Sequence, residues 1–246
     1  MKTSAYLALL LACMTPAAAF ADDDNPSLVD QVAQSLKGQS ILLGVNYSQG
    51  TFKMIGVNQA AGSAELTNNG TASLILDYTS PEHVLAKYKM TYGDAVWGLN
   101  FVGTFGQQKT NYENQPGQSI IVGSNLSTQM TGDYLAGAPL LYLRLSPLYA
   151  NTDSYWLFGY GIGAALYHFS GVPIVYQPNP LGGITANAFT YSTTSKIFLY
   201  QTARWQFHYG NWDAIVTVKQ LGPRAVQGYN VVYTDYGFGI AYNFHF

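Results

Sequence analysis

The chain has 246 residues, a formal net charge of −2, 10% charged residues and 15% aromatic residues. Soluble domains carry about 25% charged residues, so this sequence has too little charge to cover a water-facing surface. No basic patch is present, which argues against nucleic acid as a partner. Cys13 is the only cysteine, so a disulfide and a cysteine metal site are excluded within one chain.

The first 21 residues predict a secretory signal peptide. Lys2 supplies a positive start, residues 5–12 are apolar, and residues 19–21 have the small-x-small form of a cleavage site. Cleavage after Ala21 would remove Cys13. An alternative stays open, because residues 10–13 also resemble a lipoprotein box, in which Cys13 would be lipidated and kept.

No stretch after the predicted signal peptide has about 18 consecutive apolar residues without charge, so the sequence predicts no transmembrane helix. The mean hydropathy is nevertheless near zero. A closed β-barrel is the other structure that satisfies its backbone hydrogen bonds in lipid. We therefore predict an all-β fold, an antiparallel transmembrane β-barrel over 40–246, in the outer membrane of a Gram-negative bacterium.

The N-terminal segment 22–39 precedes the barrel and predicts a short amphipathic helix at 25–37. Asn25 can cap it, Pro26 suits its first turn, and Gly38 ends it. This helix is either a spacer between the signal peptide and the barrel or an interfacial clamp on the periplasmic side.

The first third of the barrel has two readings. In the first, a hairpin at 40–57 and 64–79 is followed by a periplasmic turn at 80–83 and one strand at 84–106, with a bulge at Gly93-Asp94. In the second, Gly93-Asp94 is itself a turn and 40–57 lies outside the barrel. Both readings give eight strands, and ten stay possible. The alternation of Ile41, Leu43, Val45 and Tyr47 favours the first.

Period-2 alternation predicts the remaining strands at 130–145, 154–169, 191–209, 211–221 and 229–246. The stretches 107–129 and 170–190 are long and polar or rich in Pro and Gly, which predicts loops. The connections at 146–153 and 209–211 are short. Bacterial barrels have long outer loops and short periplasmic turns, so the two long loops are predicted to lie outside the cell.

The C-terminal strand carries large apolar residues at every second position, ending with Phe238, Ile240, Tyr242, Phe244 and Phe246. This pattern resembles the C-terminal assembly signal of bacterial outer-membrane proteins, without indicating a specific family. The resemblance implies a small outer-membrane β-barrel. Its expected partners are the barrel assembly machinery, outer-membrane lipid and lipopolysaccharide.

Charged residues of both signs have the inward parity of the predicted strands. They are Asp77, Lys87, Lys89, Arg144, Lys196, Arg204, Asp213, Lys219 and Asp235. Because an isolated buried ion is costly, such charges must pair. They predict either a polar core that closes the barrel or the lining of a narrow channel for small solutes.

One group of residues has the chemistry of an esterase. His168 and Ser170 have outward parity at the outer end of one strand, and Asp133 lies within about two residues of facing His168 on the next. The arrangement resembles the His-x-Ser motif of the outer-membrane lipid A 3-O-deacylase family, which implies His168 as base and Ser170 as nucleophile. Here Gly171 follows the serine, where that family has Asn, and Asp133 would replace its downstream Glu.

The four histidines are scattered along the chain and no glycine fingerprint of a phosphate loop is present, so no metal or cofactor is expected. The sequence therefore favours a non-catalytic barrel with a structural or surface-interaction role. A narrow channel and a lipid A-modifying esterase are the alternatives.

Overall fold

The computed structural model describes residues 37–57, 63–67, 70–111, 129–147, 154–171, 174–178, 184–188, 191–192 and 195–245. The predicted signal peptide, all but the last residue of the predicted helix, and Phe246 lie outside this part of the chain. Every regular element within it is a β-strand, and all pairings are antiparallel. The predicted fold class is confirmed. The described residues include no helix that is long and apolar enough to cross a membrane.

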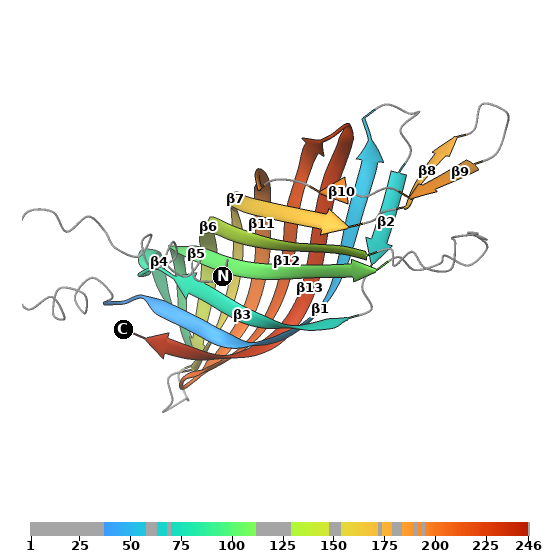
Figure 1. Cartoon of the computed structure of the whole chain (residues 1–246). Helices are drawn as coiled ribbons and strands as arrows, with labels where there is room; N and C mark the ends of the chain where they lie inside the picture. The colour runs from blue at the N-terminus through green and yellow to red at the C-terminus, as the bar shows by residue number, and fades with distance from the viewer. Residues whose placement is uncertain are drawn as a thin grey trace, which may run out of the picture.

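Eight strands form a closed ring in the described chain, because each pairs with the next and the last pairs with the first (Figure 1). In ring order they are β1 (Ser40–Gly56), β3 (Thr71–Thr79), β5 (Gly93–Asn111), β6 (Gln129–Pro147), β7 (Ser154–Gly171), β11 (Lys196–Tyr209), β12 (Trp212–Val226) and β13 (Tyr229–His245). The closing pair joins Ser40 to His245 and continues to Gly56 and Tyr229. Closure removes the free edges that lipid cannot satisfy.

The remaining strands pair with members of this ring or with one another. β2 (Ser63–Thr67) pairs with the outer end of β1, and β10 (Tyr191–Ser192) pairs with β7. β8 (Ile174–Pro178) and β9 (Ile184–Ala188) form a hairpin, and β8 also pairs with β2. This hairpin corrects the prediction of a loop over 170–190, because the Pro and Gly residues that suggested a loop leave room for two short strands.

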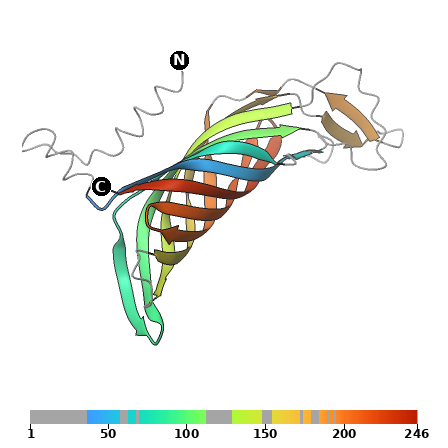
Figure 2. The ribbon, with the colours of Figure 1, turned by 90° about the horizontal axis from the view of Figure 1, so that it is seen from below.

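The first third of the barrel combines parts of both sequence readings. Residues 40–56 belong to the ring, as in the first reading. The chain turns at Thr91-Tyr92, so the predicted single strand 84–106 is wrong and is replaced by a hairpin of β4 (His83–Met90) with β5. This hairpin projects beyond the barrel (Figure 2). β3 and β4, separated by 80–82, together occupy the place of one long strand beside β5.

Side chains alternate between the lumen and the outer surface along each ring strand. Large apolar residues point outward and stay exposed, for example Val45, Leu74, Ile162 and Ile197. Aromatic residues gather on the outer surface near the two-residue turn at Gly210-Asn211, where Trp156 contacts Trp205 and Phe207 (centroid distances 5.8 and 4.4 Å). An apolar belt bordered by aromatic side chains is the surface that a membrane barrel presents to lipid. The long connections leave the opposite end, which we call the outer end because bacterial barrels carry their long loops outside the cell.

Candidate functional site

An aromatic cluster fills the outer half of the lumen. Tyr167 lies at its centre and contacts Phe169, Phe198 and Tyr233 at centroid distances of 4.9, 5.1 and 6.3 Å. Phe169 also packs on Phe52 at 5.2 Å. These rings come from β1, β7, β11 and β13 and are almost completely buried. The cluster therefore spans the lumen from one wall to another.

A buried ion pair lies below the aromatic cluster. Arg204 pairs with Asp77, and their side chains are only 5% and 2% exposed. Thr104 donates a second hydrogen bond to Asp77 (2.9 Å). Nearby, Lys219 lies opposite Asp235 on the adjacent strand. Opposite charges thus face one another in the middle of the lumen, as buried ions require.

The periplasmic end of the lumen contains a third polar group, centred on Asp213. This carboxylate accepts hydrogen bonds from Gln206 (2.8 Å) and Asn243 (2.7 Å) and lies 2.9 Å from Nδ1 of His208. His208 stacks on Tyr155 with a centroid distance of 4.5 Å. A cavity of about 460 Å³ adjoins this group, and Arg204 is among the residues that line it.

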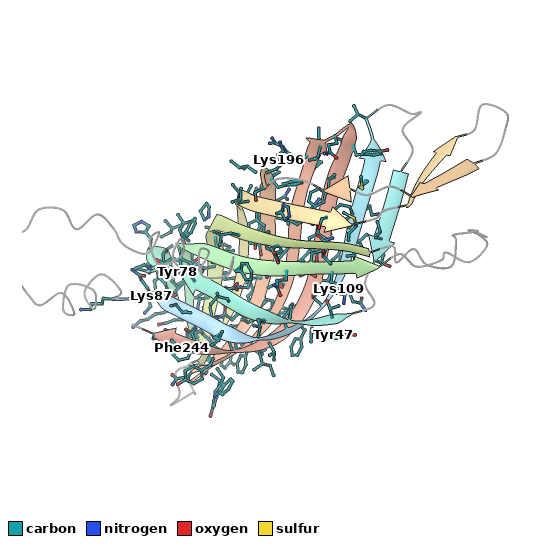
Figure 3. The ribbon with its side chains drawn as sticks, in the orientation of Figure 1. Tyr47, Tyr78, Lys87, Lys109, Lys196 and Phe244 are labelled. Atoms are coloured by element: carbon teal, nitrogen blue, oxygen red, sulfur yellow. The ribbon has the colours of Figure 1, made fainter. Side chains whose placement is uncertain are left out.

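The predicted lumen charges occupy three kinds of position. Asp77, Arg204, Asp213 and Asp235 are buried in the lumen, and Arg144 and Lys219 are partly exposed. Arg144 binds both carboxylate oxygens of Glu82 (2.7 and 2.8 Å). Lys196 is exposed at the outer end of β11, far from Phe244 at the periplasmic end (Figure 3).

The prediction was wrong for Lys87 and Lys89. Both lie on β4, in the hairpin that projects beyond the ring, and both are exposed there instead of lying in the lumen. Lys87 instead pairs with Asp94 of the same hairpin (2.9 Å), and its side chain is 58% exposed.

A polar patch interrupts the apolar outer wall near its outer end. Gln107, Asp133 and His168 stand opposite one another on β5, β6 and β7. Asp133 thus directly faces His168, within the two-residue range expected from the sequence. The Gln107 side chain donates to Asp133 at 3.4 Å. One step farther out, Lys109, Thr131 and Ser170 form a second row.

Two serines lie beside His168. Ser170 is on the same face of β7, two residues along the strand. Ser195 directly precedes β11 and is the lateral neighbour of His168, because the next pair in the register joins Lys196 to Tyr167. Ser195, His168 and Asp133 also line the same hollows in the wall. The sequence did not indicate Ser195, since the long connection between β7 and β11 carries no information on their register.

The described residues contain no group of three or more His, Cys, Asp or Glu that could hold a metal ion. The outer patch presents one acid, one imidazole, one ammonium and several hydroxyl and amide groups.

No protein-family model and no curated protein matches the chain. Among solved structures it is similar to Neisserial surface protein A, with 10% identity, 82% of this chain and 97% of that chain covered, and a TM-score of 0.37. It is also similar to the outer membrane enzyme PagL, with 10% identity, 78% and 97% coverage, and a TM-score of 0.33. A third is the translocator domain of the autotransporter NalP from Neisseria meningitidis, with 10% identity, 99% and 98% coverage, and a TM-score of 0.24.

The chain is a closed antiparallel β-barrel with the outer surface of a membrane-spanning barrel. Its closed ring and apolar outer belt establish this fold from its own geometry. The similar structures carry different descriptions, so the role of this barrel has to be argued from its own residues.

Proposed function

We propose that this barrel has a non-catalytic structural or surface-interaction role and acts through its outer wall and rim. The observation that carries this proposal is the filled lumen. The aromatic cluster around Tyr167 and the Arg204–Asp77 pair occupy successive levels of the interior. A narrow channel for small solutes would need a continuous path through both levels, which disfavours the channel alternative.

The proposed partners follow from the side chains of the outer wall. Its apolar belt faces lipid, and the polar patch near the outer rim faces the headgroups of the outer leaflet, where lipopolysaccharide is the expected neighbour.

For export, we propose that the signal peptide is cleaved after Ala21. The barrel assembly machinery would then recognise β13 and insert the barrel into the membrane.

Dye uptake by intact cells tests this role. Cells that lack the protein are expected to admit an apolar dye faster than wild-type cells, because a component that stabilises the outer leaflet is missing. Expression of the full chain restores the slow uptake, and so does the His168→Ala variant, because the proposed role needs no catalysis. Uptake that is unchanged when the protein is absent contradicts the structural role.

A second candidate function, a lipid A-modifying esterase, is favoured by the register that places Asp133 opposite His168. In this mechanism a serine Oγ attacks an ester carbonyl while His168 takes the hydroxyl proton and returns it to the leaving alkoxide. Water then hydrolyses the acyl-serine, releasing a fatty acid, and Asp133 orients His168. Either Ser170 or Ser195 would supply the nucleophile.

Mass spectrometry of lipid A tests this candidate. Cells that produce the protein are expected to lose one ester-linked acyl chain from lipid A, and the His168→Ala variant to leave it intact. His83→Ala is the matched control, because His83 is an exposed histidine of the projecting hairpin. Separate Ser170→Ala and Ser195→Ala variants identify the nucleophile. Lipid A that is unchanged by the intact protein rules out the esterase.

A further inference from the structure

The cavity at the periplasmic end of the lumen has the size of a small-molecule site. Its volume is about 460 Å³, and such sites typically have about 300–1,000 Å³. Its lining includes Arg204, which is buried, and Gly38 and His245, which are exposed near the two ends of the described chain. The cavity therefore extends from the interior of the lumen to the periplasmic surface. Phe244, labelled in Figure 3, lies at the same end of the barrel.

Two buried asparagines of this lining have an amide oxygen without a partner. Asn100 of β5 and Asn243 of β13 are only 7% and 3% exposed, and neither Oδ1 atom accepts a hydrogen bond from the described residues. The orientation of the Asn243 amide is fixed, because its Nδ2 donates to Asp213 (2.7 Å) and a carboxylate can only accept. Buried polar groups normally form hydrogen bonds. The two oxygens therefore indicate a ligand that donates hydrogen bonds.

The lining also holds a buried donor without a partner. Arg144 binds Glu82 through Nη1, whereas its Nε donates no hydrogen bond to the described residues. A hydroxyl group can donate to an amide oxygen and can accept from a guanidinium N–H. A molecule with several hydroxyl groups can therefore satisfy the two asparagines and Arg144 together.

The pairing of the arginines in the lining favours a neutral ligand. Arg204 pairs with Asp77, and Arg144 pairs with Glu82. An ion inside the cavity would have to displace one of these partners or stay without a counter-ion, and a buried charge without a counter-ion is costly. Apolar side chains such as Leu42 also line the cavity, and they suit the C–H groups of a sugar.

We propose that the periplasmic cavity binds a neutral, polyhydroxylated molecule of about the size of a monosaccharide. Hydroxyl groups of the ligand donate to Oδ1 of Asn100 and Oδ1 of Asn243, and one of them accepts from Nε of Arg144. The site lies at the opposite end of the barrel from the outer rim, so it adds a binding activity to the proposed role of the outer wall.

Protection of a single cysteine against labelling tests the proposal. Because Cys13 is the only cysteine, a chain expressed from Asp22 carries none, and Ser40→Cys introduces one reporter into the lining. The protein in detergent micelles is treated with a small methanethiosulfonate reagent at rising concentrations of glucose or N-acetylglucosamine. Labelling is expected to slow about tenfold when the sugar reaches about ten times its Kd.

Thr91→Cys is the matched control, because Thr91 is exposed in the turn of the projecting hairpin and does not line the cavity. Its labelling rate is expected to stay the same. The proposal is overturned if neither sugar slows labelling at Ser40→Cys, or if both positions slow equally. Equal protection by inorganic phosphate or by putrescine would reveal a site for ions and would also overturn it.

A substitution in the lining tests the role of the asparagine. In the Ser40→Cys background, Asn100→Leu is expected to raise the sugar concentration needed for half-maximal protection about fivefold, because one hydrogen bond is lost. Asn46→Leu is the control, since Asn46 also has inward parity but does not line the cavity, and it is expected to change nothing. Heat-modifiable migration on gels verifies that both variants fold. Equal effects of the two substitutions contradict the assigned site.

A longer sugar identifies the source of the ligand. Protection by glucose but not by maltotetraose supports a site for free monosaccharides. Protection by both supports a site that also takes the end of a glycan chain. Dye uptake by cells depends on neither result, so the cavity and the structural role are tested separately.

Discussion

Removing one partner of the Arg204–Asp77 pair is expected to destabilise the barrel strongly. Both side chains are at most 5% exposed, so the Arg204→Met variant leaves the Asp77 carboxylate buried without its counter-ion, with the hydrogen bond from the Thr104 hydroxyl still in place. Breaking a buried pair by removing one ion costs about 3–5 kcal/mol. Replacing both ions with apolar residues, in Arg204→Met with Asp77→Leu, is expected to cost much less, because no unpaired charge then remains.

Urea unfolding of the protein in phospholipid vesicles measures these differences, followed by the change of tryptophan fluorescence. The Arg144–Glu82 pair is the matched control, since its side chains are 26% and 32% exposed. Removing that pair is expected to change the free energy of unfolding by about 0–1 kcal/mol. If Arg204→Met and Arg144→Met lower the stability equally, or if the double variant is as unstable as Arg204→Met, the reasoning about the buried lumen charge is refuted.

Three other substitutions test the packing of the wall and lumen. Gly163→Ala places a methyl group against the carbonyl oxygen of Gly137 and is expected to lower the free energy of unfolding by about 1–3 kcal/mol. In the control variant Gly103→Ala, the nearest atom to the new methyl group is 3.7 Å away, so the free energy of unfolding is expected to change by less than about 0.5 kcal/mol. Ile162→Lys puts a charge on the lipid face in the middle of β7 and is expected to lower the free energy of unfolding by about 2–4 kcal/mol, against no comparable loss for Ile162→Leu. Asp213→Ala leaves three buried side chains without their common acceptor and is expected to lower the free energy of unfolding by about 2–3 kcal/mol. A decrease below about 0.5 kcal/mol would contradict the assignment of a hydrogen-bonded group around Asp213.

Much of the barrel follows from the alternation of apolar and polar residues, because a ring strand has one face in lipid and one in the lumen. The strands β6, β7 and β13 could be predicted on that basis. The turn at Thr91-Tyr92 could not, because neither residue is a typical turn former. At Gly93 the apolar residues change from one set of alternate positions to the other. Both a bulge and a turn explain such a change, so the sequence does not choose between them.

The candidate site was predictable where a short connection fixes the register. The connection between β6 and β7 is short, so counting outward from it placed Asp133 opposite His168. Ser195 follows a long connection, and its position beside His168 needed the pairing of β7 with β11.

Single-channel recording in a planar bilayer tests the central claim, that the lumen is closed, most directly. The wild-type protein is expected to insert without conductance steps, whereas a Tyr167→Ala and Phe169→Ala double variant, which removes the centre of the aromatic cluster, is expected to produce them. Discrete steps from the wild-type protein that change in size with Arg204→Ala would show that solutes pass through the lumen and would contradict the claim.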